Sequence, residues 1–249
     1  VRWKDIKIQT EHLEPMPYDD IPVWNLLDNQ LSEQEKQLGF QLLFNGMDLS
    51  GWRNVYSDET PSDRWSVKNG ALVVSASDGS ETGNDIVTVE NFDAFELVFD
   101  FKLTEGANSG IKYFVNEAYN SGGKSGIGLE YQLLDDERHP DANQGVVGNR
   151  TLASLYDLIP AENKDNRYMK KIGEWNHGRL IVKKDNWVEH WLNGFKVLSY
   201  ERKSAIFKAL VARSKYAGFE GFGMNEKGPI LLQDHGDTVF FKNIKIRKL

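Results

Sequence analysis

The stretch Phe95-Glu-Leu-Val-Phe-Asp-Phe-Lys-Leu103 decides the fold class, because apolar and polar side chains alternate along most of its length. In an extended chain, one face carries the apolar set Phe95, Leu97, Phe99, Phe101 and Leu103. The other face carries Glu96, Asp100 and Lys102. This alternation is typical of an antiparallel strand with one face against a core and the other toward water.

Other short β-type runs surround this stretch and are separated by turn residues. Asn69-Gly70 predicts a hairpin between 65–68 and 71–74, and Asn193-Gly194 predicts the second turn of a meander over 179–183, 188–192 and 196–200. Further strands are expected at 86–89, 110–115 and 128–134, and 230–233 is expected to pair with 238–247. The sequence therefore predicts an all-β fold, a two-sheet antiparallel sandwich or barrel.

Helix is scarce, and the chain start differs from the rest. The capping-box pattern from Ser32 to Glu35 predicts one short helix that ends near Leu38. Residues 1–31 contain three prolines and no periodicity, which indicates an N-terminal extension before a single domain at 32–249. The polar segment 135–171 is long for a loop in a compact domain, and such loops usually carry function.

Composition excludes several function classes. The 249 residues carry a net charge of −7, and no basic block is longer than a Lys-Lys pair, so a nucleic-acid partner is not expected. No apolar run approaches the roughly 18 residues of a transmembrane span. The absence of cysteine excludes disulfides and thiolate chemistry. Seven tryptophans suit the binding of sugar rings, and they suit a sandwich core equally well.

The strand 128–136 offers the first candidate site. Glu130 and Gln132 share a face, and a bulge after Gln132 would bring Asp135 onto that face as well. The spacing is similar to the paired-carboxylate strand of jelly-roll glucanases, except that Gln132 stands where an acid is expected. A solvated outer face is the plain structural alternative for Glu130.

A second candidate is the segment Gln233-Asp-His-Gly-Asp237, where Gln233 and His235 share a face. Histidine can transfer protons near neutral pH, although an isolated histidine in a turn is usually inert. Asn108 begins a strand, just before Gly110, whose lack of a side chain allows a ligand close to the backbone. On 188–194, either His190 or its neighbours Glu189 and Trp191 can face a groove, but not both.

A possible divalent-metal site is the third candidate. Asp135, Asp136 and His139 offer hard oxygen ligands and one imidazole, although their spacing matches no EF-hand loop or zinc helix. An acidic loop without metal is the simpler interpretation.

The ordered set of motifs resembles one bacterial family, the 3-keto-disaccharide hydrolase domain, over about 210 of 249 residues. The resemblance rests on the blocks Glu35–Trp52, Asn108–Ile111, Gly128–Asp136, Leu155–Pro160, Gly173–Asn176, Val188–Gly194, Ser214–Tyr216, Gly228–Asp237 and Phe241–Ile246. It departs from the family pattern at Tyr216, Pro229 and Lys242.

The resemblance implies a concanavalin A-like or laminin-G-like jelly roll that is exported to the periplasm or cell surface and acts on carbohydrate. It further implies cleavage of 3-keto-glycosides, by removal of the proton next to the ketone, elimination and hydration. For that chemistry we expect His235 as the base, Glu130 as the acid/base partner of the leaving group, and sugar contacts from Asn108, Gln132, Asp135, His190, Lys215 and Gln233. A non-catalytic carbohydrate-binding module and an ordinary glycoside hydrolase are the alternatives.

Overall fold

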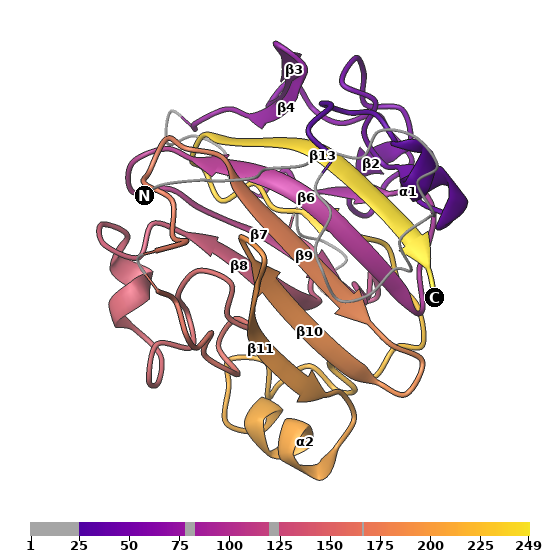
Figure 1. The fold of residues 1–249 in the computed structure, drawn as a ribbon. Coiled ribbons are helices and arrows are strands. Elements are labelled where there is room, and N and C mark those ends of the chain that lie inside the picture. The colour runs from indigo at the N-terminus through magenta and orange to yellow at the C-terminus, as the bar shows by residue number, and fades with distance from the viewer. Residues whose placement is uncertain (1–24, 78–82, 120–124, 166) are drawn as a thin grey trace, which may run out of the picture.

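The computed structural model describes residues 25–77, 83–119, 125–165 and 167–249, and these form two antiparallel sheets packed face to face (Figure 1). The two-sheet antiparallel sandwich predicted from the sequence is confirmed. Most of the predicted extension, residues 1–24, lies outside the described residues. The strands are β1 (Gln41–Leu42), β2 (Trp52–Asn54), β3 (Trp65–Lys68), β4 (Ala71–Val74), β5 (Ile86–Thr88), β6 (Phe95–Leu103), β7 (Asn108–Tyr113), β8 (Leu129–Leu134), β9 (Asn176–Val182), β10 (Trp187–Leu192), β11 (Phe195–Glu201), β12 (Leu231–Leu232) and β13 (Val239–Lys248).

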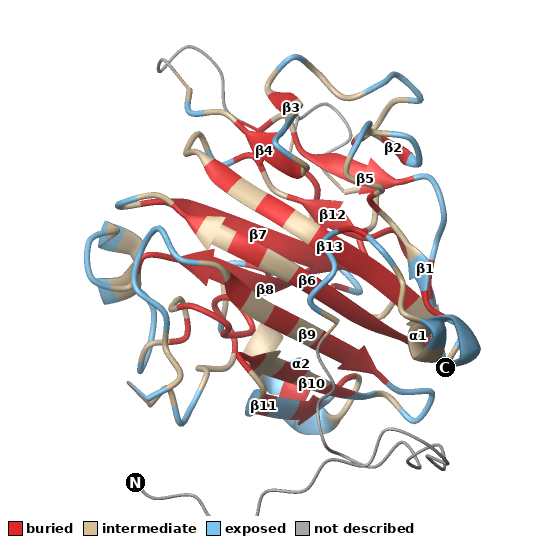
Figure 2. Cartoon of the chain, turned by 45° about the horizontal axis from the view of Figure 1, so that its top comes forward, coloured by how far each residue is buried: buried red, intermediate tan, exposed pale blue. Residues whose placement is uncertain are grey.

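The larger sheet has eight strands in the order β11-β10-β9-β6-β13-β4-β3, with β1 paired to β13. Its central strand β6 carries the alternating apolar and polar pattern, and Phe95, Phe99 and Phe101 on it are fully buried. Figure 2 shows the buried residues concentrated along the strands of both sheets, with exposed residues in the connecting loops. Removing these aromatic faces from water is the main favourable term for such a fold.

The smaller sheet has five strands in the order β2-β5-β12-β7-β8, and it carries the polar face of interest. Ile111 is directly opposite Tyr131, and both are fully buried in the core between the sheets. The neighbouring pair, Lys112 opposite Glu130, therefore lies on the outer face, because successive side chains of a strand point to opposite sides.

Both predicted turns are confirmed, and one predicted pairing is wrong. Asn69 and Gly70 both have positive φ between β3 and β4, and Asn193 and Gly194 both have positive φ between β10 and β11. However, β12 pairs with β5 and β7, whereas β13 pairs with β1, β4 and β6. The segment 233–238 therefore crosses from one sheet to the other instead of closing a hairpin.

Two short α-helices lie outside the sheets in the described part of the chain. The predicted helix is present as α1 (Glu33–Gln37), with both hydrogen bonds of the capping box between Ser32 and Glu35. The helix α2 (Ala205–Val211) was not predicted from the sequence, although Ser204 caps its first turn by accepting a hydrogen bond from the Phe207 amide. A 3₁₀ turn, η1 (Pro140–Asn143), lies within the long polar segment.

Candidate functional site

A hollow of about 230 Å³ opens on the outer face of the five-stranded sheet. It is below the roughly 300–1,000 Å³ of typical small-molecule pockets, which suits one sugar-sized unit better than an extended chain. Its charged and amide side chains come from β7, β8, the end of β12 and the segment after α2. The lining residues are Lys112, Gly126, Ile127, Gly128, Glu130, Lys215, Tyr216, Phe219 and Gln233.

Glu130 is the carboxylate at the centre of this hollow. Only 4% of the residue is exposed, and no described residue forms a hydrogen bond or ion pair with its carboxylate. The side chain lies across Gly110 on the neighbouring strand, where a Cβ would be 2.2 Å from Glu130 Oε1. Glycine at this position therefore makes room for the carboxylate, which is buried without the partner that such groups usually have.

Lys112 lies directly opposite Glu130 and is also buried. Its ammonium donates to the Gly126 carbonyl at 3.0 Å and lies 3.6 Å from the carboxylate of Asp85. Burial raises the pKa of Asp85 to about 6, against the opposing effect of Lys112. Lys112 is thus held at the base of the hollow, next to Glu130.

Lys215 is the second cation of the hollow. Its ammonium lies 4.0 Å from the ring centroid of Tyr156 and 5.2 Å from that of Tyr216. Its backbone N–H donates to Asp157, which fixes the segment after α2 against the long polar loop. Desolvation by the surrounding protein lowers the pKa of the Lys215 ammonium, and the nearby Glu130 carboxylate partly opposes this shift. Its ammonium therefore gives up a proton more readily than that of an ordinary lysine.

The predicted amide contacts divide into two groups. Gln233 lines the hollow, and its side-chain oxygen is buried without a hydrogen-bond partner. Gln132 and Asn108 lie behind the lining, where Gln132 Nε2 donates to Asn108 Oδ1 at 3.1 Å. The Gln132 oxygen also lacks a partner. Buried amide oxygens are usually satisfied, so the two free acceptors indicate a place prepared for hydroxyl or water donors.

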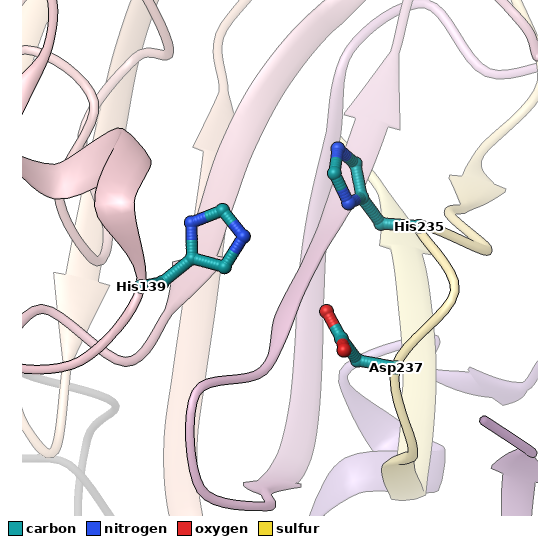
Figure 3. Close-up of side chains that lie close together, drawn as sticks. All are labelled: His139, His235 and Asp237. Atoms are coloured by element: carbon teal, nitrogen blue, oxygen red, sulfur yellow. The ribbon is translucent and has the colours of Figure 1, made fainter. Parts of the chain in front are cut away.

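His235 lies on the same outer face, two residues beyond Gln233 on the crossing segment. Desolvation lowers the pKa of its imidazole, and the nearby Glu130 carboxylate opposes this shift. Figure 3 shows the rings of His139 and His235 and the carboxylate of Asp237 turned toward a common space. One ligand-type atom of each lies within 4.8 Å of those of the other two. The structure thus places His235 within electrostatic reach of Glu130 and beside His139 and Asp237.

The three predicted metal ligands are not together in the structure. The Asp135 carboxylate accepts hydrogen bonds from the Gly106 and Glu137 amides. Asp136 accepts from the Leu152 amide and pairs with Lys164. The predicted bulge is also wrong, because β7 and β8 pair without a register shift and Asp135 follows the end of β8. Asp135 therefore shapes a turn and does not join the face of Glu130.

The cluster of His139, His235 and Asp237 has the donor atoms for a divalent ion, but one of its rings is oriented against this use. His139 Nδ1 accepts a hydrogen bond from the Asp141 amide at 3.2 Å. In the neutral ring, the proton is then on Nε2, the nitrogen that faces the other two groups. A metal ligand needs a free lone pair there, so the arrangement favours a hydrogen-bond donor.

His190, an expected sugar contact, lies in the core and not at the hollow. It is fully buried, its Nε2 is 3.0 Å from the Tyr113 hydroxyl, and its Nδ1 is 2.9 Å from the Ala153 carbonyl. Strand alternation could not decide which face of the strand carries His190. In the structure His190 faces the core, and Glu189 and Trp191 face outward. Burial lowers the pKa of His190 to about 4.

This shift predicts a pH-dependent loss of stability. The unfolded chain binds the proton below about pH 6.5, while the folded chain resists it down to about pH 4. The His190 contribution is therefore complete above pH 6.5, and about 3 kcal/mol of it is lost as the pH falls toward 4. Urea unfolding at several pH values should show a flatter profile for His190→Gln than for the wild type. Parallel profiles would contradict this origin of the acid sensitivity.

Sequence reasoning missed two residues of the site, Lys112 and Asp237, and expected His139 only as a metal ligand beside Asp135 and Asp136. Lys112 lies within a predicted strand, two positions after Gly110, so alternation alone would have placed it on the polar face. Asp237 and His139 are brought together only by the crossing segment and by the turn at η1. No local spacing signals that contact.

Several known proteins share sequence and fold with this chain. The profile of the 3-keto-alpha-glucoside-1,2-lyase-like domain family matches residues 39–247. A Bacteroides thetaiotaomicron protein named 3-keto-disaccharide hydrolase is 36% identical over 234 residues, which cover 85% of this chain and 79% of that protein. Two crystal structures from Parabacteroides distasonis, both assigned as candidate glycosyl hydrolases, share the fold. One has a TM-score of 0.78 at 34% identity, covering 90% of this chain and 100% of the other. The second has a TM-score of 0.54 at 27% identity, covering 80% and 99%.

Proposed function

Because the chain belongs to the 3-keto-alpha-glucoside-1,2-lyase-like domain family and is a carbohydrate hydrolase, we propose that its substrates are 3-keto-glycosides. In such a sugar the C3 ketone acidifies the proton on C2. Removal of that proton allows C1 to expel its substituent, and addition of water to the resulting enone completes a net hydrolysis. This route needs a base at C2, an acid/base group at C1 and a cation near the ketone oxygen.

One observation carries the proposal: the buried Glu130 carboxylate has no partner among the described residues and lies in a sugar-sized hollow that two lysines also line. A carboxylate that faces the bound sugar and has no protein partner is free to accept a proton, so we assign the removal of the C2 proton to Glu130. This keeps the two catalytic residues expected from the sequence and exchanges their roles.

We assign proton transfer at C1 to His235. Its protonated ring gives a proton to the leaving oxygen, and the same ring accepts a proton from water when water adds to C1. Desolvation lowers the pKa of the ring below the ordinary 6.5, and the Glu130 carboxylate partly opposes this shift. A single imidazole can therefore act in both directions near neutral pH.

The remaining lining groups suit the bound sugar. The Lys215 ammonium has no ion-pair partner among the described residues and can stabilise the enolate oxygen that forms at C3. The unpartnered oxygen of Gln233 can accept a hydrogen bond from a sugar hydroxyl. Lys112, fixed by Asp85 and the Gly126 carbonyl, holds an ammonium group at the base of the hollow.

An ordinary retaining glycosidase is less well supported by the site. That mechanism uses two carboxyl groups about 5–5.5 Å apart. Of the described residues that line the hollow, only Glu130 carries a carboxylate, and Asp135 is held in its turn. A binding module has no need of a buried, unpartnered carboxylate, since burying such a charge costs stability.

The test compares 4-nitrophenyl 3-keto-glucosides of both anomeric forms with their unoxidised parents. We expect the purified wild-type protein to release nitrophenol from a 3-keto form and to leave both parents intact. Because the chemistry begins at C2, replacing the C2 hydrogen by deuterium should slow turnover. Cleavage of an unoxidised parent at a comparable rate would instead identify an ordinary glycosidase, and inertness toward all four compounds would refute the proposal.

An exported location remains part of the proposal. Among the described residues, no helix is long and apolar enough to cross a membrane. Fractionation of the native host, with detection of this chain in periplasmic, surface and cytosolic fractions, tests export directly. Recovery in the cytosolic fraction alone would contradict it.

A further inference from the structure

We propose that His139, Asp237 and His235 hold the water that adds to C1, and that His139 and Asp237 govern hydration of the enone and not its formation. The inference deepens the proposed function and rests on it. It separates two stages spatially: Glu130 within the hollow removes the C2 proton, and the histidine–aspartate cluster supplies water.

The dimensions of the cluster suit one oxygen atom. The three facing atoms lie within 4.8 Å of one another, so some point between them is within about 2.8 Å of each. That distance is an ordinary hydrogen-bond length. A water at this point can contact all three groups at once, although the three groups form no hydrogen bond with one another that would compete for it.

His139 supplies a donor whose direction is fixed by the backbone. It caps η1, and its Nδ1 accepts the Asp141 N–H. The proton of the neutral ring is therefore on Nε2, toward the cluster. A donor at this point occupies one lone pair of the water and leaves the other free to attack carbon.

Asp237 supplies an acceptor that is equally fixed. Its Oδ2 accepts a hydrogen bond from the Asn108 amide at 2.9 Å, which joins the crossing segment to the start of β7. Its remaining acceptor capacity faces the cluster and can take one hydrogen of the water. His235 can take the other hydrogen, and it is the ring that we assign to proton transfer at C1.

Every proton that is removed during elimination is returned during hydration. In elimination, Glu130 takes the C2 proton, the C1–O bond breaks, and the leaving oxygen takes the proton of His235. In hydration, the water oxygen bonds to C1, its proton goes to His235, and Glu130 returns a proton to C2. No oxidant or reductant is consumed, and both residues return to their starting states. His139 and Asp237 exchange no proton and act as positioning residues.

The experiment measures how the products divide between enone and 3-keto-glucose. His139→Phe removes the Nε2 donor, and Asp237→Asn keeps an oxygen for the Asn108 amide while replacing an acceptor by an amide group. With a 4-nitrophenyl 3-keto-glucoside, we expect both variants to release nitrophenol within a few-fold of the wild-type rate. The conjugated enone, followed by its ultraviolet absorbance, should rise at least ten-fold as a share of the products.

His177→Phe is the matched control, because His177 pairs with Asp100 on the larger sheet, away from the hollow. Circular dichroism melts establish that the variants are folded, and hydration of the isolated enone supplies a second measurement. An unchanged product division in both folded variants, with wild-type rates of enone hydration, overturns the inference and leaves the proposed function standing. A wild-type protein that does not act on 3-keto-glucosides overturns the proposed function itself.

Discussion

Glu130→Gln is expected to lower kcat/KM for a 3-keto-glucoside by about 10²–10⁴-fold, the usual range for loss of a positioned general base. The amide keeps the shape of the side chain and cannot accept the C2 proton. Steady-state release of nitrophenol measures the loss. It should be similar for good and poor leaving groups, because proton removal from C2 precedes departure of the substituent.

A second variant tests the position of the carboxylate rather than its chemistry. Gly110→Ala places a Cβ 2.2 Å from the present position of Glu130 Oε1, so the carboxylate has to move. We expect activity to fall more than the melting temperature, because the displaced atoms, Oε1, Cδ and Cγ, all belong to one flexible side chain beside the hollow. Glu137→Gln is the control, since Glu137 is exposed in the loop after β8. Wild-type activity in folded Glu130→Gln would remove the base assignment.

His235→Ala is expected to show a loss that depends on the leaving group. A disaccharide needs a proton on its departing oxygen, whereas nitrophenolate leaves readily without one. We therefore expect about a 10²–10⁴-fold loss of kcat/KM for a 3-keto-disaccharide and a much smaller loss of nitrophenol release. Coupled detection of the released sugar, run beside the nitrophenol assay on one protein preparation, measures both.

The pH dependence of the rate distinguishes an acid from a base at His235. An acid must be protonated, and desolvation lowers the pKa of this imidazole below 6.5. Activity on the disaccharide should therefore decline as the pH rises through that lowered pKa, and the decline should vanish in His235→Ala. A wild-type rate that instead rises with pH over the same range would identify the ring as a base, the role first expected from the sequence.

The parts of the fold that could be predicted are those decided by local pattern. The alternation in 95–103 and the Asn-Gly turns are properties of neighbouring residues, and strand and hairpin geometry depend directly on them. The pairing of 230–233 with 238–247 failed for the opposite reason. The short turn at Gly236 resembles a hairpin turn locally, but the Asp234 carboxylate pairs with Arg64, 170 positions away in the chain.

In the candidate site, too, local pattern predicted some positions, and tertiary contacts decide the others. Alternation in β8 placed Glu130 and Gln132 together, and both lie on the outer face. Alternation could not choose the side of His190, whose position is decided by hydrogen bonds to Tyr113 and Ala153 from other elements. The meeting of His139 with Asp237 depends on tertiary structure alone.

The segment 233–238, which crosses between the sheets, connects the position of His235 to the packing of the two sheets. Asp234 is fixed both by Arg64, just before β3, and by Asp85, just before β5, so the imidazole one residue later is anchored to both layers at once. The layers cannot slide or part without moving this ring away from its carboxylate neighbours. Turnover is consequently a sensitive reporter of whether the two halves of the protein are correctly joined.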